Sequence, residues 1–189
     1  MLEELMNLVR QSGQEQVVNN PAIPNQYNEQ VMHEAGNSIV GGLQQALSGG
    51  GLAQILKLFG QGGRGQGAGS LLQNPLVQNI ISQFTGKLTG QFNIDHNQAS
   101  QVSSNLIPQV LQNITGKVTD PGDSSVDING VMQSLSGGQA NGIDFSSLLQ
   151  KFSGGDVDGD GDSDLQDIMA KMSGSGGGGM MDMVKGLFK

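Results

Sequence analysis

The clearest helical pattern in this 189-residue chain is Asn74-Pro75-Leu76-Val77-Gln78-Asn79-Ile80-Ile81-Ser82-Gln83-Phe84-Thr85-Gly86-Lys87-Leu88. Asn is a favoured N-cap residue, and Pro is favoured at the first position of a helix. The apolar residues that follow recur every three or four positions and form one broad stripe: Leu76, Val77, Ile80, Ile81, Phe84 and Leu88. We therefore expect an amphipathic helix that buries this stripe against other helices.

A second helix is expected directly after the first. Asp95 is placed to cap it, with Gln98 three residues later as in a capping box. Pro108 is expected to kink or restart the helix, which stops at Thr119-Asp120-Pro121-Gly122. Its inward face consists of Ala99, Val102, Leu106, Val110, Leu111, Ile114 and Val118. The two patterns together predict a central helical core over residues 74–119.

Three further helical patterns lie in the N-terminal segment, residues 1–59. The first ends near Gly13 and repeats apolar residues at helical spacing: Leu2, Leu5, Met6 and Val9. The second covers about residues 26–47 and has Val31, Ala35, Ile39 and Leu43 on its inward face. The third has an apolar face formed by Leu52, Ile55, Leu56 and Phe59. Inside the second, Gly36, Gly41 and Gly42 either allow another helix to approach closely or break the helix. Residues 60–73 are rich in Gly, which is typical of a linker.

A short repeat fills residues 123–174. Each copy has an Asp before a helix of about three turns and Ser-Gly after it, which are favourable capping and stopping residues. The copies are residues 127–137, 144–154 and 164–174. None of these short helices can bury its apolar face alone, so we expect them to stack on each other, on the core or on another subunit.

Alternating Asp residues between the second and third copies predict a calcium loop at residues 156–167. A hard divalent cation takes about six to eight oxygen ligands, and alternate residues of a tight loop point their oxygens inward. Gly161 stands at the sharp turn of such a loop. The predicted ligands are Asp156, Asp158, Asp160, Asp162 through its carbonyl, Asp164 directly or through a water, and Asp167. Calcium is the expected ion, and magnesium could replace it.

The loop departs from the calmodulin type at two positions. Asp167 stands where a Glu is usual, and Ser163 stands where an aliphatic residue is usual. A closing Asp followed by Ile168 resembles the dockerin-type variant of the EF-hand loop. The alternative interpretation is a solvated acidic turn without a metal.

The C-terminal segment, residues 175–189, is a Gly-rich tether followed by an amphipathic tail. The apolar residues of the tail share one helical face: Met180, Met183, Val184, Leu187 and Phe188. Five of the nine Met residues lie between Met169 and Met183, and Met suits adaptable interfaces. The tail could dock on another molecule or cap its own core, and membrane association is a weaker alternative because only Lys185 and Lys189 would attract anionic lipid.

Several stretches of the chain resemble the YidB-like bacterial family, whose members carry a domain of unknown function. They are Lys87-Leu88-Thr89-Gly90-Gln91-Phe92, Asn97-Gln98-Ala99 and Asn105-Leu106-Ile107-Pro108-Gln109-Val110-Leu111. The resemblance implies an all-α fold with a homeodomain-like arrangement of helices in the core. It implies no established activity and no catalytic residues.

Charge and composition narrow the class of function. The net charge is −8, and most of it falls after Thr119, while the nine basic residues are scattered singly, which disfavours nucleic-acid binding. His33 and His96 lie in separate helical segments without acids at catalytic spacing, so no enzyme is expected. The chain has no cysteine, which leaves the redox compartment undetermined, and no stretch long and apolar enough to span a membrane. The acidic N-terminus does not match a signal peptide, so a cytoplasmic location is expected.

The leading hypothesis is a small, acidic, non-enzymatic protein that folds as an all-α multi-helix array. It is expected to self-associate or act as a scaffold and to hold one structural calcium ion. Its expected contacts are the apolar helix faces and the Met-rich tail. The alternatives are a nucleic-acid-associated regulator, by analogy with the homeodomain-like fold alone, and a calcium-responsive switch.

Overall fold

The structure is a computed structural model, and it describes residues 2–62, 68–120, 122, 126–136 and 144–152. Every regular element in this part of the chain is helical, so the predicted all-α multi-helix array is confirmed. In chain order the elements are α1 (Leu2–Gly13), the π-helical turn η1 (Gln14–Val18), the 3-10 turn η2 (Asn25–Tyr27), α2 (Asn28–Ser48), α3 (Leu52–Gly62), α4 (Ala68–Leu71), α5 (Pro75–Phe92), α6 (His96–Thr119), α7 (Ile128–Leu135) and α8 (Phe145–Phe152).

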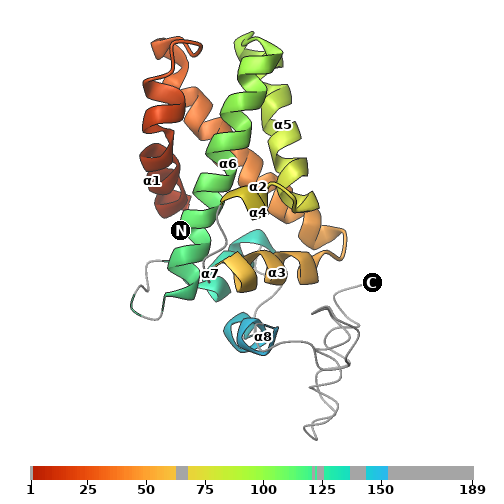
Figure 1. Cartoon of the computed structure of the whole chain (residues 1–189). Coiled ribbons are helices and arrows are strands. Elements are labelled where there is room, and N and C mark those ends of the chain that lie inside the picture. The colour runs from red at the N-terminus through yellow and green to blue at the C-terminus, as the bar shows by residue number, and fades with distance from the viewer. Residues whose placement is uncertain (1, 63–67, 121, 123–125, 137–143, 153–189) are drawn as a thin grey trace, which may run out of the picture.

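Four long helices form an up-and-down bundle. Helices α1, α2, α5 and α6 alternate in direction, and α5 packs on both α2 and α6 while α1 packs on α2 and α6 (Figure 1). The short helices α3, α7 and α8 lie across the lower end of the bundle in Figure 1, and α4 contacts α6. The bundle therefore has one end closed by turns and the other covered by short helices.

Local capping residues set the bounds of the two central helices. Asn74 accepts a hydrogen bond from the backbone N–H of Leu76 at 2.9 Å, and Asp95 accepts one from the N–H of Asn97 at 2.9 Å. Between the two helices, Asn93 adopts a left-handed conformation with φ 54°, which Asn tolerates better than most residues. The predicted N-caps are confirmed, and the turn at Asn93 reverses the chain into α6.

Pro108 lies inside α6, which runs without interruption from His96 to Thr119. Of the two alternatives expected at this position, a kink or a restart, the restart is excluded. The side chain of Pro108 is buried among the other inward residues of α6, so packing holds the helix together where one backbone hydrogen bond is missing. Residues 74–119 thus form the two helices α5 and α6.

Helix α2 is unbroken, and two of its glycines lie in close helix contacts. A Cβ atom on Gly42 would overlap the side chain of Ile80 in α5, and one on Gly36 would come within 2.9 Å of the Met6 sulfur in α1. Gly41 faces open space. Of the two alternatives at these glycines, close approach is correct for Gly36 and Gly42, and a break is excluded.

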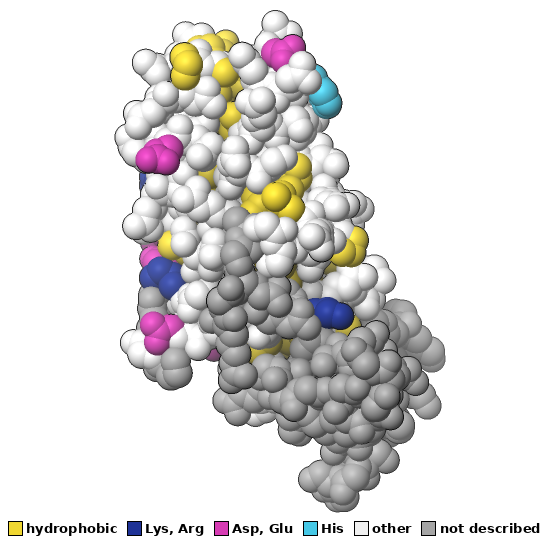
Figure 2. Space-filling view, in the orientation of Figure 1, with side chains coloured by type: hydrophobic (Ala, Val, Ile, Leu, Met, Phe, Trp, Pro, Cys, Tyr) yellow, Lys and Arg dark blue, Asp and Glu magenta, His cyan; other side chains and the backbone are white. Residues whose placement is uncertain are grey.

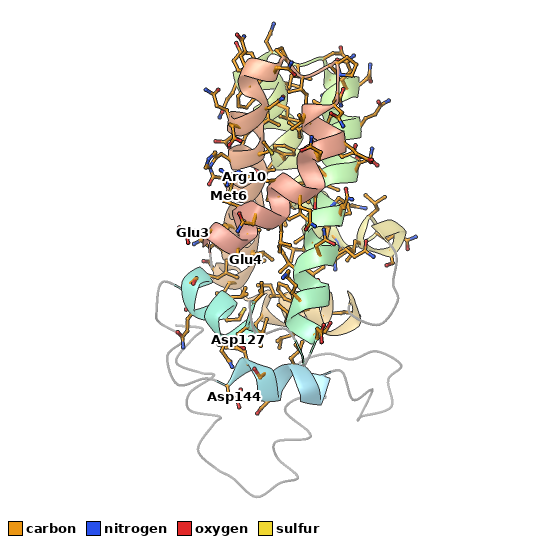
Figure 3. All side chains as sticks on the ribbon, turned by 90° about the vertical axis from the view of Figure 1, so that its left-hand side faces the viewer. Glu3, Glu4, Met6, Arg10, Asp127 and Asp144 are labelled. Atoms are coloured by element: carbon orange, nitrogen blue, oxygen red, sulfur yellow. The ribbon has the colours of Figure 1, made fainter. Side chains whose placement is uncertain are left out.

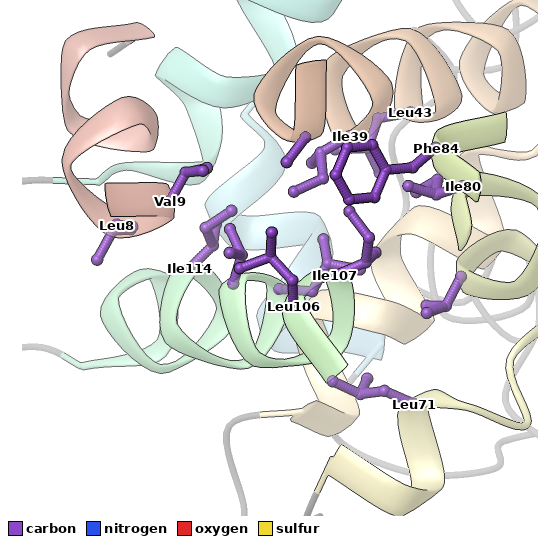
Figure 4. Packing of buried hydrophobic residues seen from close by; sticks show 14 of the residues in the cluster. Leu8, Val9, Ile39, Leu43, Leu71, Ile80, Phe84, Leu106, Ile107 and Ile114 are labelled. Carbon is purple, nitrogen blue, oxygen red and sulfur yellow. The ribbon is translucent and has the colours of Figure 1, made fainter. Parts of the chain in front are cut away.

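One hydrophobic core joins all parts of the described chain. It includes residues of the N-terminal segment, of the central helices and of α7 and α8, with Phe59, Phe84 and Phe145 fully buried. In Figure 4 apolar side chains of α1, α2, α5 and α6 converge between the ribbons. The segments before and after the Gly-rich residues 60–73 therefore share one core.

The first two copies of the C-terminal repeat form the predicted capped helices. Asp127 accepts a hydrogen bond from the N–H of Gly130 at 3.1 Å at the start of α7, and Asp144 accepts one from the N–H of Ser147 at 3.1 Å at the start of α8. Helix α7 contacts α2 and α8, and α8 packs mainly on α3. The third copy lies outside the described residues.

Candidate functional site: an apolar pocket

An apolar pocket of about 260 Å³ lies where α7 meets the lower part of the bundle. Among its described lining residues, Ser134 alone has a polar side chain. The lining comes from α1, α2, α3, α6, α7 and the residue leading into α7, and consists of Leu5, Leu8, Ile39, Val40, Leu43, Phe59, Ile114, Val126, Val131, Ser134 and Leu135.

The helices supply different parts of this pocket. Leu8 of α1, Leu43 of α2 and Phe59 of α3 are buried and form its interior. Leu5 and Val40 are half-buried and Ser134 is exposed, so these three residues mark the mouth. Because α7 has only eight residues, it covers this part of the bundle without filling it. The result is a hollow with an apolar interior and an opening to the surface.

The apolar lining of the pocket makes an apolar occupant favourable. Because the pocket opens to the surface, a segment that enters it removes apolar area from water, which is favourable by about 25 cal/mol for each Å². Water is a poor filler, since a buried water needs about two to four polar partners and the described lining offers one hydroxyl. An apolar group is therefore the occupant that this pocket suits.

Acidic residues stand beside the mouth of the pocket. Glu4 directly precedes the lining residue Leu5 and forms an ion pair with Lys117 of α6 at 3.4 Å, and the exposed Glu3 lies one position earlier. Asp127 is exposed and follows the lining residue Val126. In Figure 3 the labelled Glu3, Glu4 and Asp127 lie along the part of the molecule where α1 begins and α7 packs. An apolar segment that also carries positive charge would match the apolar pocket and these acidic residues.

A second hollow, of about 260 Å³, lies at the opposite end of the bundle. Asn20, Pro21, Ala22, Gln98 and Gln101 line it, and none of these side chains is charged or apolar enough to define a ligand class. The face in Figure 2 is likewise mostly uncharged and polar, with single charged side chains between small hydrophobic groups. This hollow carries no specific chemistry.

The predicted calcium ligands Asp156, Asp158, Asp160, Asp162, Asp164 and Asp167 lie outside the described residues. Helix α8 ends at Phe152, four positions before the first predicted ligand. Within the described part of the chain, no group of three or more His, Cys, Asp or Glu side chains could hold a metal ion. The calcium loop, and the tail after it, stay predictions.

The two histidines are separate and exposed. His33 lies on α2 and His96 is the first residue of α6. The pocket itself was not predicted. Leu5, Ile39 and Leu43 were expected to be inward-facing, but Leu8, Val40 and Val126 were missed. Leu8 could have been found from the sequence, because it lies three positions after Leu5 and so shares a helical face with it on α1.

None of the helices in the described part of the chain has the length and apolar character needed to cross a membrane. Comparison with protein-family models gave no match, and comparisons with curated proteins and with solved structures found no similar protein. The resemblance to the YidB-like family therefore remains a prediction.

Proposed function

We propose that this protein is a non-enzymatic helical scaffold that holds an apolar segment of a protein chain in the pocket between α1, α2, α6 and α7. The observation that carries this proposal is the pocket, which is apolar inside and opens to the surface at Leu5, Val40 and Ser134. Apolar side chains on a short helix are the groups that such pockets commonly receive from a protein partner. When the segment belongs to a second copy, the same contact produces self-association.

The bundle suits a scaffold because its helices are tightly joined. Gly42 lets α2 contact Ile80 of α5 directly, and Lys87 of α5 forms an ion pair with Glu34 of α2 at 2.6 Å. On the other side, Asn113 of α6 donates a hydrogen bond to Ser12 of α1 at 3.0 Å. These contacts support a rigid platform on which the lining residues keep fixed positions.

One structural calcium ion in residues 156–167 is the second part of the proposal. Six Asp residues supply carboxylate and carbonyl oxygens, which are the ligands that calcium prefers. The first and second copies of the repeat form α7 and α8, and the loop stands between the second copy and the third. The role of the ion would be to fix the angle between α8 and the helix expected at residues 164–174.

The binding of a protein segment can be tested by photo-cross-linking of the purified full chain. A diazirine-bearing residue at position 134 reports on the mouth of the pocket, and the same residue at position 101 is the control, since Gln101 is exposed at the other end of α6. We expect position 134 to capture a peptide from outside the lining, and position 101 to capture none. If position 134 yields only adducts with the lining residues or with solvent, the proposal is wrong.

A further inference from the structure

The tail of the chain has the chemistry that the pocket requires. We propose that residues 180–189 of the same molecule occupy the pocket between α1, α2, α6 and α7. This inference rests on the proposed function, because it names the segment that the pocket holds. It differs from the general proposal in committing to one occupant and to docking within one molecule.

The apolar residues of the tail fit the interior. Met180, Met183, Val184, Leu187 and Phe188 recur at helical spacing, so a helix over this segment would present them on one face. A cavity of about 150 Å³ accepts a benzene molecule, so the present pocket has room for about two groups of that size. The ends of Leu187 and Phe188 match this volume, and the flexible Met side chains can adapt to the mouth.

The tail can reach the pocket from the end of α8. Helix α8 packs on α3 and α7 at the end of the bundle where the pocket lies (Figure 1). Residues 153–179 span at most about 90 Å when fully extended, so the tail has enough chain to reach the pocket. Attachment to the same molecule also gives the tail a high effective concentration at the pocket, which a segment from another molecule lacks.

The charges of the two partners have opposite sign. Glu4 and Asp127 are chain neighbours of the lining residues Leu5 and Val126, and Lys117 forms an ion pair with Glu4. The tail segment 180–189 has two Lys residues against one Asp, although residues 119–189 as a whole are acidic. Attraction between exposed charges is weak and screened by salt, so it favours docking without deciding it. The apolar contact carries the specificity.

A pair of introduced cysteines tests this inference, since the native chain has none. In the full chain, Ser134→Cys places a thiol at the mouth of the pocket and Gly186→Cys places one beside Leu187. The control pair combines Gln101→Cys with Gly186→Cys. Gln101 is exposed and lies about 20 Å from Ile114 along α6. Under mild oxidation of dilute protein, we expect the first pair to close within one molecule at least roughly tenfold faster than the control.

Two further results decide between occupants. Adding Leu187→Asp and Phe188→Asp to the first pair should lower its rate to that of the control, because the tail then loses its apolar anchors. Disulfide-linked dimers in place of closed monomers would overturn docking within one molecule and identify a second copy as the donor. Equal rates for the two pairs would overturn the tail as occupant. The proposed function would survive that outcome if the diazirine at position 134 captured another segment.

Discussion

Asn129 of α7 holds the first residue of α8 in place. Its Oδ1 accepts a hydrogen bond from the backbone N–H of Phe145 at 2.7 Å, and its Nδ2 donates one to Ser146 Oγ at 2.8 Å. The N–H groups in the first turn of a helix have no partner within the helix, so a side chain from a neighbouring element satisfies one of them here. The two short helices are thereby joined by polar contacts as well as by packing.

Replacing Asn129 by Ala should destabilise the protein by about 1–2 kcal/mol. Two hydrogen bonds are lost, each worth about 0.5–1.5 kcal/mol, and the N–H of Phe145 loses its partner. Urea unfolding measures the change. Gln133→Ala is the control, since Gln133 is exposed one turn further along α7 and should change stability by less than about 0.5 kcal/mol. Equal effects of the two substitutions would show that the Asn129 contacts contribute nothing.

Adjacent glycines in α2 should respond in opposite directions to Ala. At Gly42 the new Cβ overlaps Ile80, and overpacking of this kind costs about 1–3 kcal/mol. At Gly41 the Cβ meets open space, so the better helix propensity of Ala should raise stability by up to about 1 kcal/mol. Chemical denaturation of both variants gives the comparison. Stabilisation by Gly42→Ala would contradict the close contact between α2 and α5.

The stability of α8 should fall in acid because of Asp144. The hydroxyl of Ser147 and then its backbone N–H donate hydrogen bonds to this carboxylate and hold the pKa of Asp144 below its usual value of 3.8. A lowered folded-state pKa means that the contribution is fully present above the unfolded value and is lost as the pH falls through the folded value.

Amide hydrogen exchange in α8 between about pH 6 and about pH 3 follows this loss. Asp144→Asn removes the titrating group but keeps a side chain that can cap α8. We expect the protection of α8 to decline more steeply with acid in the wild type than in this variant, after correction for intrinsic exchange rates. Parallel curves would contradict the role of Asp144.

Calcium titration tests the predicted loop. Calorimetry of the full chain should show one bound ion, and the double variant Asp156→Ala, Asp160→Ala should show none, because two of the alternating carboxylates are gone. Asp182→Ala is the matched control, since it removes a carboxylate outside the loop and should leave binding unchanged. The absence of binding heat in the wild type would mean that the Asp run is a solvated turn.

Helix positions could be predicted from the sequence because their signals are local. Asn74, Asp95, Asp127 and Asp144 all cap helices where expected, and each acts within about three residues of its own position. The restart that was one alternative at Pro108 does not occur, and the reason is the same limit of local signals. The local effect of Pro108 is to interrupt the hydrogen bonds of α6, but the packing of its buried side chain against distant helices keeps the helix whole.

The pocket could not be predicted because it depends on how separate helices meet. Leu5 and Ile39 were expected to be inward-facing, yet apolar periodicity does not tell whether two inward faces touch or leave space between them. Val40 and Ser134 gain their places at the mouth only when α7 lies against α2. The glycines show the same limit, since Gly41 and Gly42 differ only in what stands opposite them.

The most direct test of the pocket as a binding site is methyl NMR of the full chain. Nuclear Overhauser contacts from the Val131 and Leu135 methyl groups report what fills the space that these residues line. We predict contacts to side chains of a segment other than the lining, with those of residues 180–189 expected first. Contacts confined to the lining residues and to water would contradict the account, because the pocket would then hold no segment of any protein chain.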